Sequence, residues 1–167
     1  DVLRAMHKNE TLDQMRQAVG WANDLGFKTQ CFFVFGSPGE TPASAERTVR
    51  FAQELNPALA FFNMMVPYPG TEAYRACFGE AGPPLDRVRW EDWVAVGPHA
   101  AVQVQGLPPL ERVVADANRR FYGRPGQVWR MLKHASNALE VWQLVRGGIA
   151  LALQILRWRL GTRRPPS

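Results

Sequence analysis

The chain has 167 residues, 46% apolar and 21% charged, which is the composition of a globular protein large enough to bury a core. Its net charge of +5 is uneven: residues 1–107 hold 9 Lys+Arg and 12 Asp+Glu, whereas residues 108–167 hold 11 and 3. A basic segment can attract nucleic acid or anionic lipid. The six tryptophans do not interleave with a compact basic patch, so nucleic-acid binding is not expected.

The first elements expected along the chain are helices. Residues 1–6 have the pattern of a short helical stretch. Thr11 begins a longer helix, because Thr11 and Gln14 have the spacing of a capping box. Gly26 stands in the usual position after a helix C-terminus.

A buried strand is predicted over residues 28–35, because the sequence there becomes an apolar, aromatic run bounded by turn residues. Such a run is typical of a parallel strand covered on both faces. A Gly-Ser-Pro-Gly turn follows. Thr41 then caps a helix predicted over residues 42–55, whose first residue is a proline.

A second apolar strand is predicted over residues 59–66, followed by a Pro-Tyr-Pro-Gly-Thr turn and a short helix near residues 72–78. Helices that alternate with strands through short links predict a parallel α/β fold. Two parallel strands do not make a stable sheet, and the chain starts without an initiator Met. We therefore expect partner strands before Asp1.

The rest of the chain divides into a connector and a helical region. Residues 79–107 are predicted to be irregular, with a short strand or hairpin arm at 101–105. Helices are expected over about 109–121, 126–137 and 139–160. The last contains an uncharged stretch, 147–156, that is too short to span a membrane. It fits a helix packed on the domain, and a helix lying in a membrane surface remains the alternative.

Both predicted strands should deliver their turns to the same side of the sheet, where ligands bind in α/β folds. Alternation places Val34 on one face of the first strand, and Asn63 and Met65 on one face of the second. Glu40 follows the first turn, and both helix capping and ligand orientation are open to it. No catalytic set or metal-ligand cluster is recognised, and Cys31 and Cys77 are expected to be reduced and buried.

Three stretches, residues 2–11, 33–41 and 67–71, resemble radical S-adenosylmethionine enzymes in order and spacing, most closely the class that also carries a cobalamin-binding domain. Residues 119–125 look like a stretch common in the C-terminal helical extension of that class. The resemblance implies an α/β fold: the C-terminal part of a partial (β/α)6, TIM-like barrel, followed by an α-helical extension. The two strands would be its fifth and sixth. Three parts follow: 1–78 from the barrel, 79–107 as connector, and 108–167 as basic helical extension.

In that family, three cysteines bind a four-iron, four-sulfur cluster that reduces S-adenosylmethionine to a 5′-deoxyadenosyl radical, which takes hydrogen from the substrate. The resemblance implies that the turn after the first strand seats the adenosyl group and that the end of the second strand contacts the adenine. The cofactor-binding residues implied by strand, turn and resemblance are Val34, Gly36, Pro38, Glu40, Asn63, Met65, Val66, Pro67 and Tyr68.

Two departures from the family pattern matter. Gly36 and Glu40 lie four positions apart, where the commoner spacing is three. The chain has only two cysteines and cannot supply the cluster motif. We therefore expect a fragment of a radical enzyme that is inactive alone, with the cluster, the first four strands and any cobalamin domain in the upstream part of the same polypeptide. Its catalytic residues stay unassigned.

The parent reaction expected from the resemblance is radical-initiated C–H functionalisation, by methylation, cyclisation or rearrangement of a small molecule, and the apolar tail suggests a lipid-like one. The alternative is a non-catalytic half-barrel module whose basic amphipathic tail docks on a membrane or a partner. A two-electron barrel enzyme ranks last, because only Glu40 is an acid–base residue at a strand end. The expected location is cytoplasmic, with peripheral membrane contact through the C-terminal helix left open.

Overall fold

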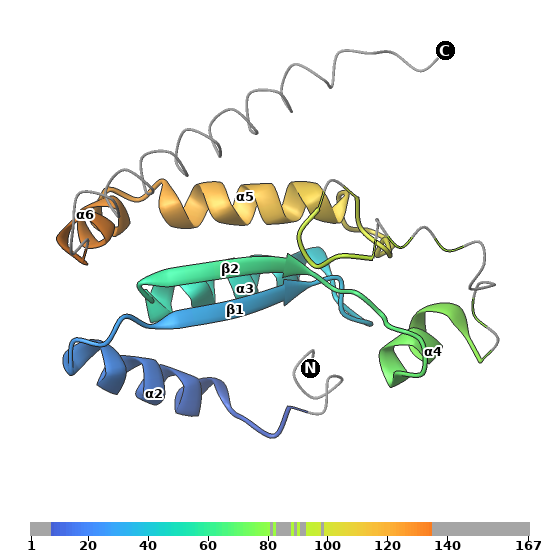
Figure 1. The fold of residues 1–167 in the computed structure, drawn as a ribbon, viewed down its shortest axis with the longest axis horizontal. Coiled ribbons are helices and arrows are strands. Elements are labelled where there is room, and N and C mark those ends of the chain that lie inside the picture. Colours follow the sequence, from blue (N-terminus) through green and yellow to red (C-terminus); the bar gives the residue numbers. More distant parts are fainter. Residues whose placement is uncertain are drawn as a thin grey trace, which may run out of the picture. The chain divides into compact units, whose positions relative to one another are not determined.

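The computed structural model describes residues 8–80, 82, 88, 90, 93–97 and 99–134. These residues form a mixed α/β fold with five helices and a two-stranded sheet (Figure 1). The helices expected over 1–6 and 139–160 lie outside the described residues. In chain order the elements are α2 (Leu12–Asp24), β1 (Gln30–Phe35), α3 (Pro42–Leu55), β2 (Leu59–Met64), α4 (Glu72–Phe78), α5 (Leu110–Tyr122) and α6 (Pro125–His134).

The chain divides into two compact units, Asp1–Gly123 and Arg124–Ser167. The first contains the sheet, α2, α3, α4 and α5, and the second contains α6. The three-part division expected from the sequence, with boundaries after residues 78 and 107, stays a prediction.

The two strands are parallel, as predicted, and their arrowheads point the same way in Figure 1. The register runs from Gln30 opposite Leu59 to Phe35 opposite Met64. Because α3 connects the end of β1 to the start of β2, the unit is a β–α–β crossover, the connection that parallel strands require.

One face of this sheet carries the core of the first unit. The Phe33 and Phe62 rings stack there with centroids 5.3 Å apart, and Phe121 of α5 meets Phe62 edge-on at 5.9 Å. The helices α3 and α5 cover this face. The buried core residues are Phe33, Phe35, Ala45, Val49, Ala52, Leu55, Ala60, Phe62, Met64, Leu110, Ala117 and Phe121.

The other face of the sheet is open within the described residues. Phe32 is 66% exposed and Phe61 is 40% exposed, and their rings stack on each other at 5.0 Å. The prediction of a strand covered on both faces is therefore wrong for the described part of the chain. An apolar run places hydrophobic side chains on both faces, but it does not say that both faces are covered.

Local capping signals in the sequence are confirmed. The Thr11 hydroxyl accepts a hydrogen bond from the Gln14 backbone N–H, and the Gln14 side chain accepts one from the Thr11 N–H. Thr41 caps α3, with Pro42 at the first helical position. Each such cap contributes about 1 kcal/mol to the stability of its helix.

The connector before α5 contains no strand over residues 101–105, so that expectation is wrong. The segment instead bends along the core, against which Val102 and Leu107 pack. The carbonyl of Ala95 accepts a hydrogen bond from the Met64 N–H at 2.8 Å, which gives one edge group of β2 a partner. None of the helices within the described residues is long and apolar enough to cross a bilayer.

Candidate functional site

The turns after β1 and β2 start side by side at one edge of the sheet. The hydrogen-bond ladder continues one residue past the end of β2, where the Met65 N–H donates to the carbonyl of Phe35, the last residue of β1, at 2.7 Å. We call residues 36–40 the first corner and residues 66–70 the second corner. Because the strands are parallel and in register, both corners follow the carboxyl ends of the strands, as predicted.

The first corner is closed by its own polar groups. The Gly36 N–H donates to Oε2 of Glu40 at 2.5 Å, and the Glu40 N–H donates to the Ser37 carbonyl at 3.0 Å. Gly36 has φ +97° and Gly39 has φ +77°, in the left-handed region that favours glycine. The corner is thus a preformed turn.

Glu40 holds this turn and does not cap α3. Thr41 and Ser44 cap the helix reciprocally, so helix capping, one of the two roles left open for Glu40, is wrong. Glu40 is only 4% exposed, and its Oε1 has no hydrogen-bond partner among the described residues. Burial raises the pKa of the carboxyl group, while the backbone N–H groups of Gly36 and Ser37 act in the opposite direction.

The second corner is a turn that leads into α4. The Tyr68 carbonyl accepts hydrogen bonds from the Thr71 N–H at 3.1 Å and from the Thr71 hydroxyl at 2.6 Å. The same hydroxyl accepts from the Tyr74 N–H and caps α4. Pro67 is buried beneath the turn, whereas the Tyr68 side chain is exposed.

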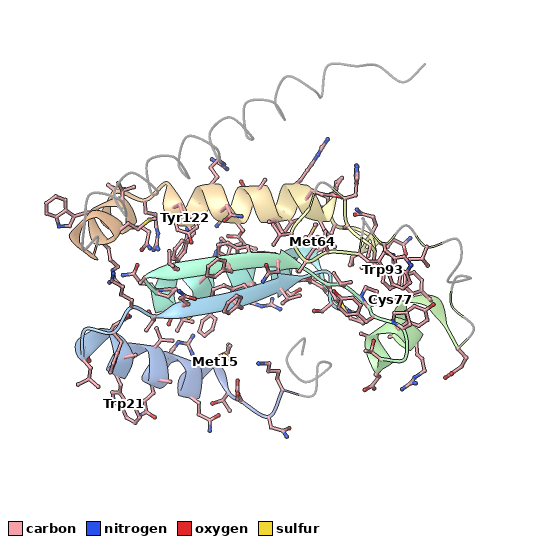
Figure 2. The ribbon with its side chains drawn as sticks, viewed as in Figure 1. Met15, Trp21, Met64, Cys77, Trp93 and Tyr122 are labelled. Atoms are coloured by element: carbon pink, nitrogen blue, oxygen red, sulfur yellow. The ribbon has the colours of Figure 1, made fainter. Side chains whose placement is uncertain are left out.

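Aromatic packing anchors α4 and the connector beside the second corner. Tyr74 and Phe78 of α4 pack against Trp93 with centroids 6.0 and 5.9 Å apart, and Trp90 meets Trp93 edge-on. Figure 2 shows Trp93 next to α4, which also carries Cys77. This cluster fixes the helix that leaves the second corner and forms a satellite to the main core.

The predicted site residues fall into two groups. Val34 and Asn63 are register partners, both half-buried, at the carboxyl end of the open face. Met65 continues the ladder one residue past the end of β2, and both Met65 and Pro67 are buried. The half-buried or exposed residues are Val34, Pro38, Asn63, Val66 and Tyr68, and the buried ones are Gly36, Glu40, Met65 and Pro67.

The open face offers neutral chemistry. Neither β1 nor β2 contains a charged residue, and the polar side chains on this face are Gln30 at its start and Asn63 near the corners. A surface of aromatic rings, one amide and nearby backbone groups suits a neutral, partly flat ligand group.

Leu110 of α5, which the sequence did not single out, touches the first corner. A methyl group placed on the Cα of Gly36 would lie 2.5 Å from Cδ1 of Leu110 and 3.5 Å from Cβ of Met65. No local sequence pattern signals this contact, because Leu110 and Gly36 belong to elements that are far apart in the chain.

The described residues contain no cluster of three His, Cys, Asp or Glu side chains that could hold a metal ion. Cys31 is half-buried on β1, whereas Cys77 is exposed on α4, contrary to the expectation that both are buried. Desolvation raises the pKa of both thiols, so neither has the lowered pKa of a reactive or metal-binding cysteine.

Two curated proteins are similar to this chain. One, from Pyrococcus horikoshii, is named as an uncharacterized methyltransferase and is 27% identical over 124 residues, which cover 74% of this chain and 27% of that protein. The other is the anaerobic magnesium-protoporphyrin IX monomethyl ester cyclase of Rubrivivax gelatinosus, 26% identical over 120 residues, which cover 72% of this chain and 21% of the cyclase. Both relatives are named as enzymes.

The chain thus spans about a quarter of the length of these two relatives. No family model matches the chain, and no solved structure matches it. The similarity relates the chain to an enzyme family at a coarse level.

Proposed function

We propose that this chain forms part of a radical S-adenosylmethionine enzyme and contributes one wall of the pocket for S-adenosylmethionine and substrate. The observation that carries the proposal is the parallel, in-register pair β1–β2, which delivers two glycine-proline corners to one edge. The two enzyme relatives, a methyltransferase and a cyclase, agree with this assignment. The parent reaction is radical-initiated C–H functionalisation of a small molecule, and S-adenosylmethionine supplies the radical.

The residues present fit an adenosyl group. The neutral open face and the backbone of the two corners would hold a flat, uncharged base and ribose. Val34, Asn63 and Tyr68 are accessible enough to touch the ligand directly. Gly36 and Glu40 are buried, and their part is to keep the first corner in shape.

The residues present do not fit an iron–sulfur cluster. Such clusters are held by cysteine thiolates, and the chain has two cysteines, of which one is half-buried in β1 and the other exposed on α4. The cluster and any cobalamin therefore belong to other parts of the parent polypeptide, and this chain alone is not expected to catalyse the reaction.

The test uses the polypeptide encoded by the complete reading frame, with S-adenosylmethionine binding measured by calorimetry. Asn63→Leu, near the corners, is expected to weaken binding about tenfold, the size of one lost, well-placed hydrogen bond. Gln30→Leu is the matched control, because Gln30 carries the same amide on the same face of the sheet, at the start of β1 and away from the corners. No binding by the wild type, or equal loss in both variants, would count against the proposed pocket.

The alternative, a non-catalytic module that docks through a basic tail, rests on the charge asymmetry of the sequence. Binding of residues 108–167 to anionic vesicles at low salt, with no S-adenosylmethionine binding by the complete polypeptide, would favour it.

A further inference from the structure

We propose that Leu110, the first residue of α5, is a positioning residue for S-adenosylmethionine: it wedges against Gly36 and sets the shape of the first corner. The inference rests on the proposed function and extends it, because it makes the helix after the connector part of the cofactor site. In this role Leu110 touches no ligand and acts through the backbone of the corner.

The Leu110 side chain occupies the space next to the Cα of Gly36. Leu110 is fully buried, so its side chain cannot swing out to solvent. The Gly36 Cα has space for Leu110 only because glycine has no Cβ, and Met65 borders the same space. Leu110 therefore lies against Gly36, the first residue of the first corner.

The far end of α5 is fixed, which prevents the helix from sliding away from the corner. The Arg120 guanidinium makes hydrogen bonds of 2.5 and 2.8 Å to the Glu46 carboxylate on α3. The Arg120 carbonyl accepts from the Gln53 side chain at 3.0 Å. The Tyr122 hydroxyl bonds the backbone of Ala60 at the start of β2.

The near end of α5 is stiff as well. Two prolines precede Leu110, and Pro109 occupies the N-cap position with φ −46°. Its carbonyl accepts from the N–H groups of Arg112 and Val113, which closes the first turn of the helix. With both ends of α5 held, the corner takes its shape against the Leu110 side chain.

The experiment measures S-adenosylmethionine affinity by calorimetry, together with the melting temperature, in the polypeptide from the complete reading frame. Leu110→Ala removes the wedge, and Leu110→Met keeps its volume. Leu110→Val shortens the side chain by one carbon, and it replaces Leu110→Ala in the experiment if the alanine variant does not fold. Phe121→Leu is the matched control, since Phe121 is equally buried on the same helix but packs on Phe62.

Leu110→Ala is expected to weaken S-adenosylmethionine binding about tenfold. Leu110→Met, which keeps the side-chain volume, should bind with an affinity within about twofold of the wild type. Phe121→Leu should lower the melting temperature without changing the affinity measured below it. Unchanged affinity in the alanine variant, or an equal loss in Phe121→Leu, overturns the positioning role while the proposed function stands. Absence of binding by the wild type overturns both.

Discussion

The hydroxyl group of Tyr122 makes two hydrogen bonds to a single residue, Ala60: it accepts from the backbone N–H at 3.0 Å and donates to the carbonyl at 2.8 Å. In Figure 2, Tyr122 lies between α5 and β2. The Leu59 N–H points to β1, where it bonds the Thr29 carbonyl, so the groups of Ala60 face the opposite edge of β2. The Tyr122 side chain thus makes the two backbone hydrogen bonds that a neighbouring strand would otherwise make at Ala60.

Tyr122→Phe is expected to destabilise the fold by about 1–3 kcal/mol, because it leaves two backbone groups at a covered edge without a partner. Urea unfolding followed by circular dichroism measures the change. Tyr68→Phe makes the same chemical change on an exposed ring and should stay within about 0.5 kcal/mol of the wild type. Equal stability of the two variants would show that the bonds to Ala60 contribute nothing.

Alanine substitutions at Gly36 and Gly39 distinguish the cost of backbone strain from the cost of steric crowding in the first corner. Both have positive φ, but an added methyl group meets Leu110 only at Gly36, and at Gly39 it meets nothing within 4 Å. Gly39→Ala should cost about 1 kcal/mol of strain, and Gly36→Ala about 1–3 kcal/mol more from crowding.

Thermal unfolding of Gly36→Ala, Leu110→Ala and the double variant completes this test. The crowding part of the Gly36→Ala loss should be partly recovered in the double variant, because Leu110→Ala makes room for the methyl group. Strict additivity of the two losses would mean that the residues do not share this space.

Much of the first unit could be predicted from the sequence, because its signals are local. Thr11 and Gln14 lie one helical turn apart, and Thr41 directly precedes the proline that begins α3. The strands, their parallel order and the common edge of the corners follow from apolar runs joined by a helix through short links.

The features that shape the site could not be predicted in the same way. The position of Glu40 next to α3 suggests a cap, but its side chain turns back to the Gly36 N–H. The contacts of Leu110 and Tyr122 join α5 to a turn and a strand far away in the chain. Such contacts depend on tertiary packing, which leaves no period or spacing in the sequence.

The ion pair between α3 and α5 predicts a loss of stability in acid. Hydrogen bonds from Arg120 and, to a smaller extent, from Arg50 lower the pKa of Glu46 from 4.5 to about 2. Because the pKa is lowered in the folded state, the charged Glu46 carboxylate stabilises the fold at pH values above 4.5. This contribution is lost as the pH falls from about 4.5 to about 2. Since the Arg120 and Glu46 side chains are 28% and 37% exposed, screening limits the effect to about 1 kcal/mol.

Glu46→Gln should therefore lower the melting temperature at pH 6 and approach the wild type at pH 2. The control Glu80→Gln, on an exposed residue after α4, should follow the wild type at both pH values. A Glu46→Gln curve parallel to the wild type across this range would contradict the role assigned to the pair.

Glu40 should show the opposite dependence on pH. Burial raises its pKa above 4.5, so the folded state favours the neutral acid. The stability that the neutral Glu40 contributes is present at low pH and is lost as the pH rises through the raised folded-state pKa.

Glu40→Gln keeps an oxygen that can accept from Gly36 and removes the buried charge, so its advantage in melting temperature over the wild type should grow from pH 4 to pH 8. Glu40→Ala removes the acceptor as well and should cost about 1–3 kcal/mol, since the buried Gly36 N–H loses its partner. If Glu40→Gln and the wild type have parallel pH profiles, the carboxyl group does not titrate in this range and its burial does not govern the corner.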